Sequence, residues 1–93
     1  MSRLIPLLVL ASLAAGAAQA ACYADYKAKQ DNPLRLHYGV MEVPDGACSR
    51  EAAASVIASR LRDGWQLLDV VSVFGPEGLD QRRASAGAYF LRY

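Results

Sequence analysis

The sequence has few of the residues that build metal centres and reactive sites. It contains a single histidine, His37, and two cysteines. His37 has no second histidine and no spaced cluster of Cys, Asp or Glu to complete a ligand set, and no pattern nominates a nucleophile for it to activate. We interpret it as a solvated or hydrogen-bonded strand histidine, and we expect no catalytic residue, no metal ligand and no cofactor.

An excess of charge of either sign is missing as well. The chain has ten Lys and Arg residues and nine Asp and Glu, and Arg3 is the only one of these in its first 20 residues, so residues 21–93 carry nine of each sign. A neutral chain has no long-range field that attracts nucleic acid or an anionic membrane, so we expect no nucleic-acid partner. Because acids are interspersed with them, we interpret the following residues as ordinary solvated charge: Arg60, Arg62, Arg82 and Arg83.

The longest apolar run lies at the N-terminus and is typical of a secretory leader. Arg3 gives a short positive region, residues 4–18 are apolar, and Ala18-Gln19-Ala20 is the small-x-small pattern of a cleavage site. The run is too short and too rich in alanine for a membrane span of roughly 20 strongly apolar residues. We therefore predict a signal peptide at 1–20, with a membrane-anchored helix as the alternative. The chain would then be periplasmic or secreted in a bacterial envelope, as a single small domain (21–93) without a membrane span.

The two cysteines, Cys22 and Cys48, are expected to form one disulfide. Export to an oxidising compartment and an even number of cysteines both favour a bridge. Closing a loop of this length would stabilise the folded domain by about 3–4 kcal/mol. Lipid attachment at Cys22 is the alternative, but Gln19 stands where a branched apolar residue is required, and Cys48 would remain unpaired. A redox-active pair is disfavoured because the spacing differs from C-x-x-C.

The clearest periodic pattern follows Cys48 and predicts a helix that ends at Gly64. Ser49 can cap its N-terminus, Glu51 suits the first turn, and Gly64 would be the C′ residue. Apolar residues recur at helical spacing and form one stripe: Ala53, Val56, Ile57 and Leu61. We expect Trp65, directly after the glycine, to anchor the core rather than to stack on a ligand.

Three segments predict strands. Residues 34–43 alternate and contain β-formers, 65–74 are rich in Val, Leu and aromatic residues, and 88–93 are aromatic, whereas 23–33 are polar and end in an Asn-Pro turn signal. The fold class is therefore α+β, with the order β-α-β-β. We expect a three-stranded mixed sheet with one helix packed on one face. A right-handed crossover would make the first two strands parallel, and the last strand would lie at the centre.

The connection at 75–87 is longer than the 2–5 residues usual in a hairpin. Long connections are often functional, so we predict that its polar residues contact a partner. The alternative is that it holds a helical turn or extends the strands. The candidate contact residues are Glu77, Asp80, Gln81, Arg82 and Arg83.

The run AASVIASRLRDGWQLLDVVSVF and the terminal YFLRY resemble a small bacterial family, the domain of unknown function 4177 group. Gly64, Trp65 and Leu67 match its helix-to-strand core, while Gln66 and Leu68 stand where the family has Glu and Val. The resemblance covers roughly residues 34–93. It implies a small strand–helix–strand fold and no catalytic residue. The leader and both cysteines depart from the usual member.

From these observations we expect an exported binding or assembly module stabilised by one disulfide. Its partner would be a second copy, bound through a free sheet edge, or another envelope protein. The alternatives are a small envelope enzyme of hydrolase type, for which 73 residues leave little room for a pocket, and a lipid-anchored accessory subunit of an envelope complex.

Overall fold

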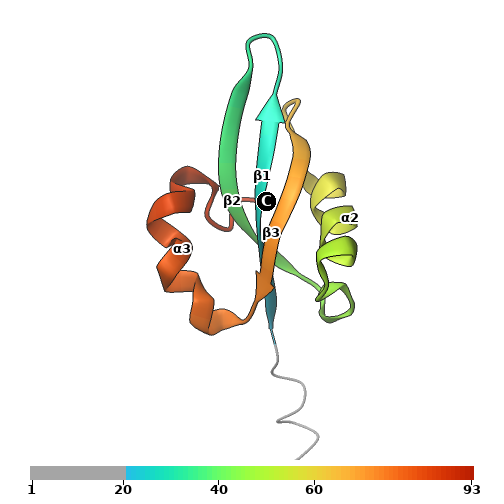
Figure 1. The fold of residues 1–93 in the computed structure, drawn as a ribbon, viewed down its shortest axis with the longest axis vertical. Coiled ribbons are helices and arrows are strands. Elements are labelled where there is room, and N and C mark those ends of the chain that lie inside the picture. Colours follow the sequence, from blue (N-terminus) through green and yellow to red (C-terminus); the bar gives the residue numbers. More distant parts are fainter. Residues whose placement is uncertain (1–20) are drawn as a thin grey trace, which may run out of the picture.

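The computed structural model describes residues 21–93, and the predicted signal peptide lies outside the described residues. Three strands form one antiparallel sheet in the order β2-β1-β3, with a helix on each side of it (Figure 1). The elements are β1 (Cys22–Gln30), β2 (Arg35–Val43), α2 (Arg50–Arg60), β3 (Gln66–Phe74) and α3 (Leu79–Ala86), with 3-10 turns η2 (Asp45–Ala47), η3 (Pro76–Gly78) and η4 (Gly87–Tyr89).

The α+β class and the three-stranded sheet are confirmed, but the sheet carries two helices rather than one, and the expected order and pairing are wrong. The polar segment at 23–33 supplies the central strand, β1, which forms a hairpin with β2. All pairs are therefore antiparallel, and the sheet is not mixed. The segment at 88–93 is not a strand. It forms a 3-10 turn and one isolated bridge, between Phe90 and Val40.

The core lies between α2 and one face of the sheet. The buried β1 residues on this face are Cys22, Ala24, Tyr26 and Ala28, and Tyr26 is fully buried in the same cluster as Met41 and Ile57. Opposite Tyr26 stands Gly39, where a Cβ atom would lie 2.5 Å from the tyrosine hydroxyl. The large ring thus fills the space that glycine leaves. Trp65 is 9 % exposed and belongs to this core, as predicted.

The N-terminal cap of α2 is confirmed, but its end is not where the sequence indicated. Ser49 Oγ accepts a hydrogen bond from the Ala52 N–H at 3.1 Å. The helix ends at Arg60, and Leu61 is already extended. Gly64 has a φ of 84° and belongs to the turn that leads into β3, so it is not the C′ residue.

The long connection at 75–87 contains η3 and α3, which is the helical alternative. α3 lies on the face of the sheet opposite α2 (Figure 1). None of the helices within residues 21–93 has the length and apolar character that crossing a membrane requires.

Candidate functional site

A buried carboxylate, Asp25, joins α3 to the sheet. Asp25 is 4 % exposed and accepts hydrogen bonds from Tyr38 Oη at 2.7 Å, Ser72 Oγ at 2.6 Å and Arg82 Nε at 3.0 Å. Burial raises the pKa of this carboxyl, but the bonds from Ser72, Tyr38 and Arg82 outweigh burial and hold the pKa below its usual value. Burial and the bond to Asp25 raise the pKa of Tyr38 to about 12.

Arg82 is fully engaged in this cluster. Its Nη1 donates to the Gly78 carbonyl at 2.8 Å, and its guanidinium lies 3.8 Å from the centre of the Phe74 ring. Both carboxylate oxygens of Asp25 and all three guanidinium nitrogens of Arg82 are hydrogen-bonded, so we interpret the cluster as the attachment of α3 to the sheet.

The single histidine lies on the other face, inside an aromatic cluster. His37 is 9 % exposed, its Nε2 is 3.0 Å from the Tyr26 hydroxyl, and Tyr89 stacks on its ring at 3.7 Å. Trp65 meets the ring edge-on at 4.3 Å. The prediction of a hydrogen-bonded strand histidine is confirmed, although His37 is not solvated. No carboxylate within residues 21–93 forms a hydrogen bond or ion pair with it.

We expect His37 to make stability fall in mild acid. Burial, helped by the charge of Arg92, lowers its pKa from 6.5 to about 4. The unfolded chain therefore takes up a proton first, and the free energy of unfolding should drop by on the order of 2–3 kcal/mol as the pH falls from 6.5 to 4. Urea unfolding at several pH values measures this. The His37→Phe variant keeps a ring in the stack and should lose most of the slope, and an unchanged slope would refute the assignment.

The outer edge of β3 is irregular. Val71 and Leu68 have no partner on β1, because the register shifts twice along the strand. Both are bulge residues, and both are exposed, Leu68 by 53 %. Arg50 Nε also donates to the Val70 carbonyl at this edge, at 3.2 Å. Bulges twist an edge away from regular pairing, so β3 is a poor template for a strand from another chain.

The outer edge of β2 is covered over part of its length by the last residues of the chain. The Leu91 N–H donates to the Val40 carbonyl at 2.9 Å, beside the parallel bridge of Val40 with Phe90. Pairing then stops, because Leu91 has a φ of 56°, a conformation that is uncommon for residues other than glycine. Tyr93 stacks instead on Tyr89, with ring centres 6.4 Å apart. Within residues 21–93, no strand pairs with the outer edge beyond Val40, at Glu42.

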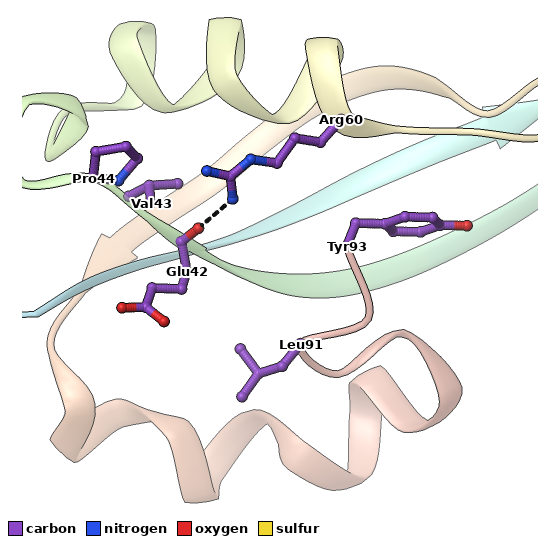
Figure 2. Close-up of a pocket in the computed structure, with 6 residues that line it drawn as sticks. All are labelled: Glu42, Val43, Pro44, Arg60, Leu91 and Tyr93. Carbon is purple, nitrogen blue, oxygen red and sulfur yellow. Dashed lines mark hydrogen bonds between the residues drawn. The ribbon is translucent and has the colours of Figure 1, made fainter.

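This open stretch of β2 is the wall of a pocket, here called the edge pocket. It has a volume of about 380 Å³, within the range of small-ligand sites, and opens between the end of α2 and the last residues of the chain (Figure 2). Its lining residues are Glu42, Val43, Pro44, Arg60, Leu91 and Tyr93.

The edge pocket holds two charges that do not pair with each other. Arg60 Nη1 donates to the backbone carbonyl of Glu42 at 2.8 Å, while the Glu42 carboxylate points away from Arg60 (Figure 2). Within residues 21–93 neither side chain takes part in an ion pair. The pocket therefore offers a guanidinium and a carboxylate, with apolar contacts from Val43 and Leu91 between and beside them.

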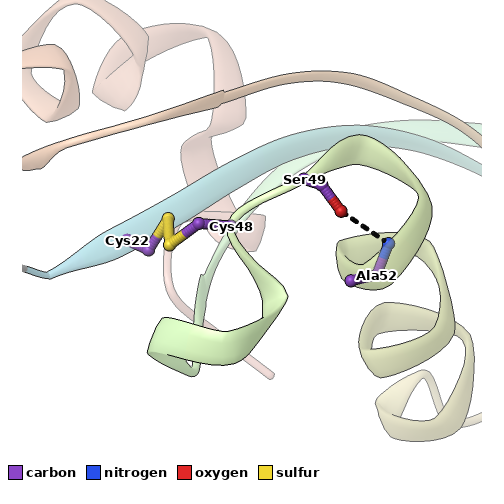
Figure 3. Close-up of a disulfide and its surroundings, with 4 residues drawn as sticks. All are labelled: Cys22, Cys48, Ser49 and Ala52. Atoms are coloured by element: carbon purple, nitrogen blue, oxygen red, sulfur yellow. Dashed lines mark hydrogen bonds between the residues drawn. A yellow bond between two sulfur atoms is a disulfide. The ribbon is translucent and has the colours of Figure 1, made fainter.

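The predicted disulfide is present. Cys22 at the start of β1 is bonded to Cys48, just before the Ser49 cap of α2, with Cα atoms 5.9 Å apart (Figure 3). The bridge ties the first residue of the central strand to the segment from which α2 starts. It lies outside the edge pocket, and we assign it a structural role.

The residues of 75–87 that were predicted to contact a partner do not line the edge pocket. Four of them are exposed on η3 and α3: Glu77, Asp80, Gln81 and Arg83. Arg82 turns inward to Asp25 instead. The edge pocket could not be predicted from local sequence patterns, because it depends on the turn at Leu91 and on the end of α2 at Arg60, which lie far apart in the chain.

Comparison with known proteins identifies no relative from which a function could be inferred. No family model, no curated protein and no solved structure matches the chain. The resemblance to the domain of unknown function 4177 group thus stays a prediction. In the part of the chain that the structure describes, no group of three or more His, Cys, Asp or Glu residues is placed to hold a metal ion.

Proposed function

We propose that residues 21–93 form an exported, non-catalytic binding module that holds a short extended peptide segment at the edge pocket. The open edge of β2 beside Glu42 is the observation that carries this proposal. The carbonyls of Val40 and Glu42 point outward, since they accept from Leu91 and Arg60. In an antiparallel ladder the N–H and C=O of one residue point to the same side, so the Glu42 N–H also faces the pocket.

An extended peptide is favoured because the same edge already accepts one. The chain segment at Phe90 and Leu91 lies on β2 as a single parallel bridge, and the turn at Leu91 frees the next backbone position. Strand addition at a sheet edge is a common mode of peptide recognition, in which main-chain hydrogen bonds supply the affinity. A full-length strand from a second copy has less room, because bulges interrupt β3 and the last residues cover part of β2.

The non-catalytic part of the proposal rests on the state of His37. The ring is 9 % exposed and stacked on Tyr89, and its Nε2 is engaged by the Tyr26 hydroxyl at 3.0 Å rather than placed beside a nucleophile. Export to an oxidising compartment is supported by the leader pattern and by the Cys22–Cys48 bridge, which such a compartment preserves.

A titration followed by NMR tests the binding site. The probe is a mixture of acetylated, amidated hexapeptides randomised at their two central positions. We expect amide shifts to change at the edge pocket, above all at Glu42 and Leu91, while those of α3 stay fixed. Two variants sharpen the test: Glu42→Gln keeps the backbone N–H, whereas Glu42→Pro removes it at an edge position where proline is tolerated. Only the proline variant should lose the response to uncharged peptides.

Shift changes confined to another surface, or none at all, would overturn the proposal. So would a Glu42→Pro variant that keeps its thermal midpoint and still binds like the wild type. If that variant unfolds, amide exchange of the wild-type Glu42 N–H decides instead. We expect bound peptide to slow this exchange, and unchanged exchange at saturating peptide would contradict edge pairing.

A further inference from the structure

We propose that the edge pocket selects segments in which an acidic and a basic residue are direct neighbours in the sequence. This inference rests on the binding function proposed above and names the chemistry of its ligand. It follows from where the two unpaired charges of the pocket lie relative to the plane of the sheet.

The guanidinium and the carboxylate lie on opposite faces of the sheet at this edge. Arg60 comes from α2 and reaches the β2 edge from the α2 face (Figure 2). Glu42 follows Val40 and Tyr38 at intervals of two, and Tyr38 points to the α3 face, where it donates to Asp25. Because alternate strand residues share a face, the Glu42 side chain points to the α3 side.

A peptide strand on this edge would place its side chains in the same alternation. Successive residues of a strand point to opposite faces, so one residue would face Arg60 and its direct neighbour would face Glu42. The first should carry a carboxylate and the second an ammonium or guanidinium group. Residues two apart would share one face, so an acid and a base at that spacing would meet only one of the two charges.

The charges of Glu42 and Arg60 also disfavour a peptide bound with its charges placed the other way round. An acidic residue beside Glu42, or a basic residue beside Arg60, would place like charges together, which discriminates between partners more strongly than attraction alone. Arg60 donates one N–H to the Glu42 carbonyl, and its remaining N–H groups can donate to a carboxylate of the peptide. Either order of the acid and the base is acceptable, because a shift by one residue exchanges the two faces.

Three blocked hexapeptides of matched length test the inference by NMR titration and by fluorescence anisotropy of labelled forms. One has Asp-Lys at its centre, one has Asp and Lys separated by a valine, and one has Asn-Gln at its centre. We expect the Asp-Lys peptide to bind about three- to tenfold more tightly than the separated one, which is the scale of one partly exposed charge contact. The neutral peptide should be the weakest of the three.

Coupling to the two side chains identifies the contacts. Replacing the peptide lysine by glutamine should weaken binding to the wild type but not to Glu42→Gln, and replacing the peptide aspartate by asparagine should do so for the wild type but not for Arg60→Gln. The matched controls are Asp45→Asn and Arg62→Gln, exposed neighbours outside the pocket, which should behave as the wild type.

The outcomes separate the two proposals. If all three peptides shift the edge-pocket signals with equal affinity, the pairing of charges is refuted and the peptide-binding function stands. Equal binding of the adjacent and separated peptides, above the neutral one, refutes the alternation. If none of the peptides shifts these signals, both proposals fail.

Discussion

Replacing Cys22 and Cys48 together by alanine is expected to lower the free energy of unfolding by about 3–4 kcal/mol. The bridge closes a loop with a sequence separation of 26 residues, and the chain-entropy relation gives this magnitude for such a loop. A domain of this size has a small core and a correspondingly small stability, so the loss is a large share of the total. The thermal midpoint should fall by roughly 10–30 °C.

The measurement is thermal and urea unfolding of the oxidised protein, the reduced protein and the double variant. Reduction should move the wild type to the position of the double variant, and the double variant should not respond to reductant. Equal stability of the oxidised and reduced wild type would contradict the structural role of the bridge. If the reduced protein does not fold at all, the same conclusion follows more strongly.

Replacing Arg82 by methionine should be comparably costly, by about 3 kcal/mol or more. Methionine keeps an apolar stem against Phe74 but leaves the Asp25 carboxylate, 4 % exposed, without its cation. Removing one partner of a buried ion pair typically costs 3–5 kcal/mol, because the remaining charge is buried and uncompensated. The bonds from Tyr38 and Ser72 stay, which places the expected loss near the lower end.

Arg83→Met is the matched control for this prediction. Arg83 is the next residue on α3 but is exposed, and its contact with Asp80 is an exposed pair worth little. The double variant Asp25→Asn/Arg82→Met should recover part of the loss, since it removes the buried charge. Equal losses for Arg82→Met and Arg83→Met, measured by urea unfolding, would show that Asp25 does not depend on its cation.

The sequence predicted those features that depend on neighbouring residues. The Ser49 cap, the body of α2 and the strand β3 follow from side chains within one or two turns, and the disulfide follows from a count of two cysteines. β1 escaped prediction because its core face carries mainly alanines, while Asp25 and Lys27 on its other face read as a polar loop. Its pairing with strands on both sides, rather than its hydrophobicity, makes it a central strand.

At residues 88–93 the sequence predicted a strand that the structure does not contain. Tyr89 and Phe90 have strong β propensity, yet Tyr89 is drawn into the stack on His37 and the turn at Leu91 ends the pairing with β2. These contacts join residues about 50 positions apart, so periodicity could not reveal them. The edge pocket, the main candidate for binding, arises at this point.

The measurement that tests the account most directly is the intact mass of the protein from the cells that make it, with thiols alkylated before and after reduction. An exported module held by a structural bridge predicts a chain that begins at Ala21 and gains two alkyl groups only after reduction. A chain that retains residues 1–20 and is alkylated twice without reduction would contradict both export and the bridge. A chain that begins at Cys22 with added acyl mass would instead make it a lipoprotein, with Cys48 unpaired.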